Sequence, residues 1–291
     1  MHTAKLCLVA AILLPACGGD GTASIGVGPS GGPSGGATSI STASPDGTIE
    51  AAFDHLKNNR VSSFIKLMAP PAELTKMQEG WAEMRKKPIE DAEDAEFQQT
   101  MSMLTADGAE DKLFAMVQPK LAEAQEQIGM LAGMAPMMAA GAIQKTGAPA
   151  DTLAMVESLG EKIAKMDIGS EANAKKAIAI VCKAAREINI PNGAAMQKLS
   201  FDQGLAKADI AYTAIVDALA VYDLDFTSTF ESVDATVIST EGDVAEVEVS
   251  VSLFGFAPQT VPVTMERADG RWFPRKEEKD ETPSTTTGMA R

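Results

Sequence analysis

Residues 241–266 read EGDVAEVEVSVSLFGFAPQTVPVTME, and their pattern decides the fold class. Valine or leucine alternates with glutamate or serine over 246–253, and valine or methionine alternates with polar residues and proline over 260–266. A period of two places apolar side chains on one face of a β-strand. Glu241-Gly242-Asp243 and Asp269-Gly270 are typical of the turns in β-hairpins. The sequence therefore predicts an antiparallel meander of about four strands with one buried face.

The chain before this meander has the period of α-helices. Leu74, Met77, Trp81 and Met84 recur at i, i+3, i+7 and i+10. Ser200-Phe201-Asp202-Gln203 has the form of a capping box, which begins a helix. Helices followed by an antiparallel sheet define the α+β class. We therefore expect a single, mostly helical α+β domain over residues 48–276, with helices over 48–225 and the sheet over 226–276.

The N-terminal segment has the layout of a secretory signal peptide. Lys5 precedes an apolar run over residues 6–14, and the small residue Ala16 stands before Cys17. The apolar run is well short of the roughly 20 residues that span a bilayer. Residues 1–16 are therefore predicted to be a signal peptide that is removed on export.

Leu14-Pro15-Ala16-Cys17 resembles the lipobox of bacterial lipoproteins, although proline before the alanine is less usual in that motif. The resemblance implies that the mature chain begins at Cys17 and carries lipid there. Two or three acyl chains would hold the protein on a membrane almost permanently, because each buried methylene contributes about 0.8 kcal/mol. By similarity to enterobacterial lipoproteins, Gly18 indicates the outer membrane, at its periplasmic face or its surface. The alternative is an ordinary cleaved signal followed by a coincidental cysteine.

Two segments of low complexity flank the expected domain. Residues 17–47 form a tether rich in Gly, Ser, Pro and Thr, and residues 277–291 form a polar tail. Both have too few apolar side chains to fold, so both are predicted to be disordered. A tether of this length spans on the order of 30 Å. The lipid-anchored domain is therefore expected to stay close to its membrane.

The two ends of the expected domain also suggest a family. The opening helix pair, broken at Asn58-Asn59, and the closing meander with Asp269-Gly270-Arg271-Trp272 resemble the cone-shaped α+β fold shared by ketosteroid isomerase and nuclear transport factor. Small envelope lipoproteins often use that fold, and the chain also looks similar to lipoproteins of gamma-proteobacteria. The helical stretch over 70–225 is far longer than that of the cone-shaped family. The likeness to gamma-proteobacterial lipoproteins implies a location and no activity.

The formal net charge is −15, and removal of residues 1–16 takes away Lys5 and makes it −16. Such an acidic surface argues against nucleic acid as a partner, because phosphate binding needs positive charge. The expected partners are therefore the membrane, through lipid on Cys17, and an apolar ligand or another envelope protein.

Cysteine and histidine are scarce. Cys7 leaves with the signal peptide and Cys17 carries lipid, so Cys182 is alone and no disulfide forms within the mature chain. Cys182 lies on the apolar stripe of a helix predicted over 171–189, which indicates a core residue, with a redox thiol as the alternative. His55 is the only histidine of the mature chain, so a multi-histidine metal site is excluded. An exposed or helix-packed histidine is expected there, with a catalytic base as the alternative.

Two acidic stretches have a chemical alternative to a structural role. Residues 90–96, EDAEDAE, are expected to form a solvated face near a helix N-terminus, with divalent-cation binding as the alternative. Asp223, Asp225, Thr227 and Thr229 are spaced like calcium ligands, but Ser228 stands where a calcium loop needs glycine. The sequence contains no phosphate loop, dinucleotide fingerprint or zinc spacing, so no catalytic residue, metal or cofactor is predicted.

Residues 128–143 contain no charged residue and are rich in Met, Ala and Gly. With Pro136 in the middle, they are expected to form a helical hairpin that is buried as core, because apolar surface left in water costs about 25 cal/mol per Å². The alternative is a flexible lining that contacts lipid, an apolar ligand or a partner. The candidate lining residues are Met130, Leu131, Met134, Met137 and Met138.

These features favour a non-enzymatic, lipid-anchored protein of the cell envelope with an interaction or structural role. The second hypothesis is a carrier or binding module for an apolar ligand, with a cavity between the sheet and the methionine-rich helices. The third is an enzyme that uses carboxylates. A closed core would favour the first hypothesis, an apolar pocket with a mouth the second, and carboxylates that meet inside a pocket the third.

Overall fold

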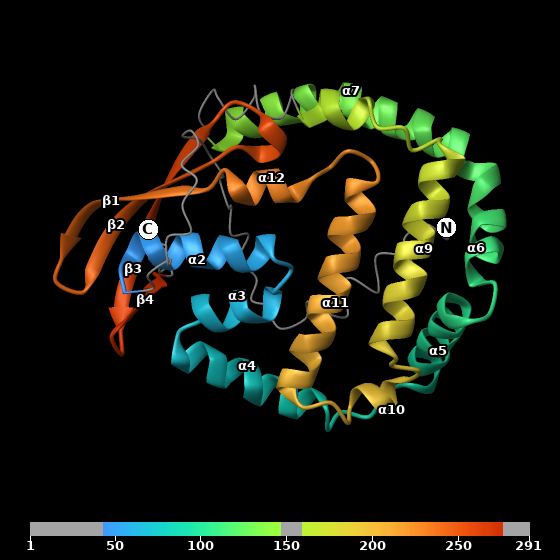
Figure 1. Ribbon diagram of the computed structural model, residues 1–291, viewed down its shortest axis with the longest axis horizontal. Coiled ribbons are helices and arrows are strands. Elements are labelled where there is room, and N and C mark those ends of the chain that lie inside the picture. Colours follow the sequence, from blue (N-terminus) through green and yellow to red (C-terminus); the bar gives the residue numbers. More distant parts are fainter. Residues whose placement is uncertain (1–42, 147–158, 276–291) are drawn as a thin grey trace, which may run out of the picture.

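Four strands form one antiparallel sheet in chain order. They are β1 (Asp234–Glu241), β2 (Val244–Val251), β3 (Gln259–Ala268) and β4 (Arg271–Pro274). The computed structural model describes residues 43–146 and 159–275, and within them the mostly helical α+β class and the four-stranded meander are confirmed. Figure 1 shows the sheet to one side of the helices.

Both predicted hairpin turns are present. Glu241 pairs with Val244 across a two-residue turn in which Gly242 has a φ of 63°. Across the second turn Ala268 pairs with Arg271, and the φ values are 51° at Asp269 and 76° at Gly270. Tight hairpins need positive φ at such positions, and Asp-Gly adopts it at low steric cost. The sequence of the turns therefore sets the register of the strands.

The connection between β2 and β3 departs from the predicted alternation. The pattern predicts extended chain as far as Leu253, but β2 ends at Val251 and a short 3-10 helix, η4 (Leu253–Gly255), follows. Phe254 and Gly255 have φ values of 51° and 77°, which turn the chain out of the strand. The hydroxyl of Thr229 accepts a hydrogen bond from the N–H of Phe254 at 2.9 Å. This bond ties the connection to the preceding helix.

That preceding helix, α12 (Phe226–Glu231), corrects the expected start of the sheet. The sheet was predicted to begin at residue 226, but β1 begins only at Asp234. Asp225 caps α12, because its side chain accepts a hydrogen bond from the N–H of Thr227 at 2.8 Å. The segment over 226–231 is too short for its period to be recognised in the sequence.

One face of the sheet forms a core with α2 (Pro45–Lys57). Along β2, Ala245, Val247 and Val249 are buried and the glutamates between them are exposed. Ile49 and Phe53 of α2 pack on this buried face. A buried side chain of this size contributes about 1.5–3 kcal/mol relative to exposure. The predicted alternation therefore corresponds to the observed division between core and solvent.

Helix α2 begins earlier than the sequence indicated. The tether was predicted to end at residue 47, yet α2 begins at Pro45, and Pro45 and Gly47 are buried. Ser44 caps the helix, because its hydroxyl accepts a hydrogen bond from the N–H of Gly47 at 3.3 Å. Proline suits the first turn of a helix, where its missing N–H costs nothing. These residues resemble a tether in composition but belong to the folded domain.

The helices before the sheet follow most of the predicted pattern. After α2 come α3 (Val61–Met68), α4 (Pro71–Met84), α5 (Asp91–Thr105), α6 (Ala109–Val117), η3 (Gln118–Lys120), α7 (Leu121–Thr146), α9 (Glu171–Ile188), α10 (Gly193–Met196) and α11 (Phe201–Ala220). Residues 159–164 are also helical, and the earlier part of the helix predicted over 150–166 lies outside the described residues. The capping box at Ser200 is present.

Helix α9 is the centre of the helical part, where it packs against α5, α6 and α11 (Figure 1). Its Cys182 has no exposed surface, so the expected core role is confirmed. On its outer side the guanidinium of Arg186 donates to both carboxylate oxygens of Glu110 on α6, at 2.6 and 3.0 Å. The hydrogen bond from Arg186 lowers the pKa of Glu110 to about 2. Apolar packing and this ion pair together join α9 to α6.

Candidate functional site

Helix α7 is continuous through Pro136, so the expected hairpin is wrong (Figure 1). A proline inside a helix removes one hydrogen bond and can kink the axis, but a reversal also needs a connecting loop. Ala135 and Met137 beside the proline are good helix formers and supply no turn. Over residues 43–146 and 159–275, α7 included, no helix combines the length and apolar character needed to cross a membrane.

Met130, Met134 and Met137 lie on one exposed face of α7. Steps of four and three residues at 100° each place them within about 60° of the helix circumference. Their exposed fractions are 67%, 45% and 74%, whereas Ala132 on the opposite side is buried. The expectation of buried core is therefore wrong for these three side chains, which we call the methionine face. The side chains of Leu131 and Met138 lie outside what the structure describes.

The orientation of α7 follows from its first turns. Gln125 faces the protein, where its side-chain oxygen accepts a hydrogen bond from the N–H of Gly169 at 2.9 Å. Glu123 and Gln127 point outward and are hydrogen-bonded to each other at 2.9 Å. Helical periodicity continues this outward face into the methionine face. The exposed face thus changes from polar to apolar along the same helix.

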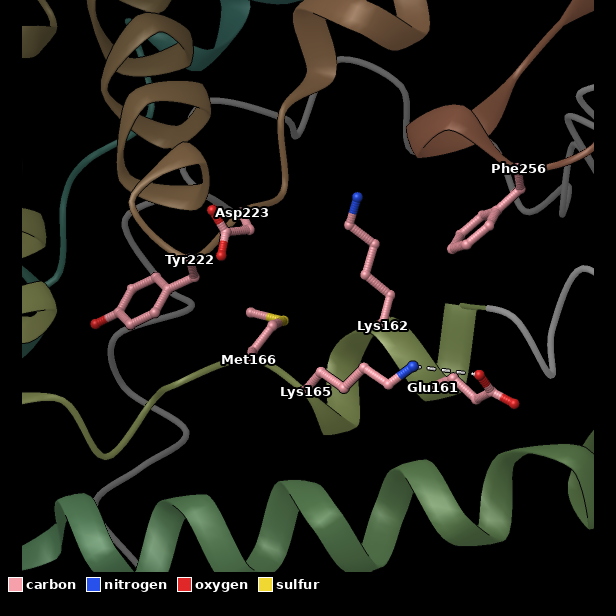
Figure 2. A pocket seen from close by; sticks show the side chains of 7 residues that line it. All are labelled: Glu161, Lys162, Lys165, Met166, Tyr222, Asp223 and Phe256. Carbon is pink, nitrogen blue, oxygen red and sulfur yellow. Dashed lines mark hydrogen bonds and ion pairs between the residues drawn. The ribbon is translucent and has the colours of Figure 1, made fainter.

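A cavity of about 310 Å³ lies between helix 159–164, the end of α11 and the connection after η4 (Figure 2). The residues that line it are Glu161, Lys162, Lys165, Met166, Tyr222, Asp223 and Phe256. Four of the seven carry charge, so this cavity is not the apolar pocket that a carrier of apolar ligands would need. Glu161 is paired with Lys165 at 3.5 Å on the same helix.

Lys162 occupies the middle of this cavity in Figure 2, and its ammonium extends into the space between the walls. Its Nζ atom lies 5.3 Å from the ring centroid of Phe254 and 5.8 Å from that of Phe256. It also donates a long hydrogen bond of 3.4 Å to the carbonyl oxygen of Phe254. Aromatic faces attract a cation at such distances, so the two rings hold the ammonium in place.

The opposite wall comes from the end of α11. Asp223 has a φ of 63°, and its exposed carboxylate points away from Lys162, toward the side of Tyr222 (Figure 2). The ring of Tyr222 points away from Lys162 in the same view. Burial, and to a lesser degree the charge of Asp167, raises the pKa of Tyr222. The phenol is therefore neutral, and the charged groups of this wall and the facing helix are carboxylates and ammoniums.

The other residues singled out in the sequence do not join this cavity. Cys17 lies outside the described residues. The Nδ1 atom of His55 is buried and has no hydrogen-bond partner among them, and burial, followed by the charge of Arg60, lowers the pKa of this imidazole. Burial raises the pKa of the Cys182 thiol. A neutral imidazole and a neutral thiol in these positions fit the packed roles expected from the sequence.

The acidic stretches have structural partners. Within residues 90–96, Asp94 accepts hydrogen bonds from the N–H of Gly193 at 2.7 Å and from Gln98 at 2.8 Å. Asp225 is the cap of α12. In the described part of the chain, no group of three or more His, Cys, Asp or Glu side chains is placed to hold a metal ion.

Comparison with known proteins gives no relative: no family model, curated protein or solved structure matches this chain. The lipobox and the cone-shaped fold therefore remain predictions from the sequence.

Proposed function

We propose that this chain is a non-enzymatic, lipid-anchored protein of the cell envelope, which binds another envelope protein through the methionine face. The observation that carries the proposal is the exposure of Met130, Met134 and Met137 on one uncharged helix face. Apolar patches on a soluble surface commonly mark interaction sites, and flexible methionines adapt to partners of different shape.

The size of the methionine face suits a protein contact. Full burial of a methionine side chain contributes about 1.5–3 kcal/mol, so three partly exposed ones supply several kcal/mol to binding. Contacts of this strength act as the centre of an interface when polar residues surround them. Glu123, Glu126 and Gln127 on the adjoining turns provide such a polar rim.

Charge favours a protein partner over a bilayer surface. The chain has a net charge of −15, and there is no Lys or Arg between Glu126 and Lys145. Helices that lie on a membrane usually combine an apolar face with Lys and Arg, which attract anionic lipids. The region around the methionine face lacks that attraction. The lipid on Cys17 would supply the membrane contact instead, through the tether.

The partner is tested by photo-crosslinking in cells, with a benzophenone amino acid placed at Met130, Met134 or Met137. We expect a discrete adduct of protein mass from these positions, because a bound partner covers them. Gln127 is the matched control, since it is exposed on the same face of α7 but lies in the polar part. Adducts with lipid only, or the same adducts from Gln127, would contradict the proposal.

The anchor is tested separately by Cys17→Ser. Loss of the acylated thiol should move the protein from the membrane fraction to a soluble or uncleaved form, and mass spectrometry should find acyl chains on Cys17 of the unmodified protein. Unchanged membrane fractionation together with an unmodified Cys17 would exclude lipid anchoring. The crosslinking result at the methionine face does not depend on this outcome if the soluble form still reaches the envelope.

A further inference from the structure

The methionine face exposes three thioether sulfur atoms on adjacent turns of α7. Methionines in the core differ, since Met101 and Met265 are buried. The surface beside the methionine face is open as well. Among the described residues, no neighbouring side chain lies within 4 Å of a Cβ added at Gly129 or Gly133, which flank it on the same helix. Small solutes can therefore reach these sulfur atoms from water, whereas the core sulfur atoms are covered.

An accessible thioether reacts with oxidants that supply one oxygen atom. In the net reaction with hypochlorous acid, the methionine sulfur forms a bond to oxygen and gives up two electrons. The chlorine is reduced to chloride, and a proton is released. The product is methionine sulfoxide, in which a flexible apolar side chain has become polar. Burial prevents the reaction, because the oxidant must contact the sulfur.

Oxidation removes what the methionine face offers to a partner. There is no charged residue between Glu126 and Lys145, so the contact depends on apolar side chains. Burial of a thioether stabilises a complex, whereas burial of a sulfoxide without a hydrogen-bond partner costs free energy. Three neighbouring sulfur atoms on one face add their effects. A partner that binds the thioether form should therefore dissociate from the sulfoxide form.

The same change costs the fold little. The side chains of the methionine face are in contact with water in the folded domain, so water solvates their sulfoxides. Met265, in contrast, lies in the core with Ile49 and Trp272, where a sulfoxide would disrupt the packing. Oxidation of the methionine face alone thus changes the surface of the domain and leaves its core intact.

We propose that the methionine face is a site of reversible oxidation, where two-electron oxidants such as hypochlorous acid form sulfoxides and thereby release the partner. This inference rests on the proposed function, because the partner released is the protein bound at this face. The reverse step belongs to a methionine sulfoxide reductase. Two thiols supply two electrons and two protons, the oxygen leaves as water, and the thiols become a disulfide.

The first test maps oxidation in the full mature chain in detergent. Hypochlorous acid is added in small portions, and mass spectrometry of peptides locates each added oxygen atom. We expect Met130, Met134 and Met137 to be oxidised at least about tenfold faster than Met101 and Met265, because buried sulfur reacts only when the structure opens. The thermal midpoint should stay unchanged until the core methionines react. Equal rates at exposed and buried positions would overturn the proposal.

The second test measures release by photo-crosslinking in membranes isolated from cells, with the benzophenone amino acid at Met134. Treatment with hypochlorous acid before illumination should reduce the adduct at least about tenfold, and a sulfoxide reductase with dithiothreitol should restore it. In a variant that also carries Met130→Leu and Met137→Leu, the adduct should be the same before and after treatment, since leucine has no sulfur. Met116→Leu is the matched control, because Met116 is exposed on α6, outside the methionine face. Its adduct should be lost on treatment as in the unmodified chain.

The outcomes separate this inference from the proposed function. An adduct that persists although mass spectrometry finds sulfoxides at Met130 and Met137 would overturn the inference alone. Equal loss of adduct from the leucine variant would also overturn it, since the oxidation responsible would lie elsewhere. Absence of any adduct before treatment would contradict the proposed function itself.

Discussion

Cys182 shows how burial controls the chemistry of a single residue. Its side chain is fully buried in α9, and burial raises the pKa of its thiol, so the reactive thiolate is suppressed. In the mature protein we expect Ellman's reagent to react with this thiol only after denaturation. Cys182→Ser should lower the free energy of unfolding by about 1–3 kcal/mol, because a hydroxyl replaces the thiol in an apolar site. Rapid labelling of the native protein would contradict this role.

Glu50 gives a prediction about pH. Burial, with the nearby charges of Asp46 and Asp234, raises the pKa of this carboxyl above its ordinary value of 4.5. The protonated form is therefore favoured by folding. The stabilising contribution of the protonated Glu50 carboxyl is fully present below pH 4.5, and it is lost as the pH rises through the raised pKa. At neutral pH the charged Glu50 thus costs stability.

Glu50→Gln should accordingly raise the free energy of unfolding at pH 7, by about 0.5 kcal/mol since the group is only partly buried. The gain should disappear at pH values below 4.5, where Glu50 is protonated in both states. Denaturant unfolding at several pH values measures this difference in the free energy of unfolding between the variant and the unmodified protein. Glu83→Gln is the control: its pKa is lowered by a hydrogen bond from Lys86, so its replacement should bring no gain at pH 7.

At the scale of elements, two helical glycines should respond to alanine in opposite directions. Gly80 in α4 has no heavy atom within 4 Å of an added Cβ, so Gly80→Ala should stabilise the protein by about 0.5–1 kcal/mol through helix propensity. At Gly204 in α11 an added Cβ would lie 2.7 Å from the ring of Trp81. That ring is fixed by a 3.0 Å hydrogen bond to the carbonyl of Leu199 and by edge contact with Phe201.

Gly204→Ala should therefore destabilise the protein by about 1–3 kcal/mol, because the indole cannot move without breaking that bond. Thermal unfolding of the two variants in parallel would show whether Gly80→Ala raises the stability of the protein and Gly204→Ala lowers it. A gain in stability at Gly204 would show that α4 and α11 can separate freely, and their close contact would then contribute little to the fold.

The elements also show what the sequence can and cannot predict. The sheet was predictable because the period of β2 and the Asp269-Gly270 turn are local features that act through neighbouring residues. The burial of α7 was not predictable in this way. Its composition matches that of a core helix, but exposure depends on whether a partner lies beside it, and among the described elements η3 is its main neighbour. Periodicity contains no information about such a long-range contact.

The cavity was unpredictable for a related reason. Lys162, Asp223 and Phe256 lie in three separate segments, and none belongs to a motif of known spacing. Asp223 attracted notice only as part of a calcium-like pattern, which the capping role of Asp225 explains in part. Charged residues are usually solvated, so the sequence gives no signal that residues of these three segments line one cavity.

At the scale of the whole molecule, aromatic contacts connect the cavity to the sheet core. Phe254, whose ring faces Lys162, meets Phe226 of α12 edge-on with centroids 4.8 Å apart. Phe226 in turn contacts Phe230 at 6.1 Å, and Phe230 contacts Phe53 of α2 at 6.2 Å. The wall of the cavity is therefore an extension of the core around α2. The integrity of α2 should affect both the core and the cavity.

That dependence makes the start of α2 important for the whole domain, which two fragments can test. Fragment 44–276 keeps Ser44, whose carbonyl accepts hydrogen bonds from the backbone N–H and the hydroxyl of Thr48, at 3.0 and 2.9 Å. It should unfold cooperatively with a thermal midpoint close to that of the mature chain. Fragment 48–276 begins where the sequence placed the boundary and lacks the cap and the buried Pro45 and Gly47.

The shorter fragment should therefore be less stable by about 2 kcal/mol, which is roughly 4–8 °C in the thermal midpoint for a domain of this size. Ser44→Ala in the longer fragment is the matched control, since it removes the cap alone and should cost about 1 kcal/mol. Equal midpoints for both fragments would show that residues 44–47 do not stabilise the domain and belong to the tether. A midpoint of fragment 44–276 well below that of the mature chain would mean that residues outside 44–276 contribute to the core.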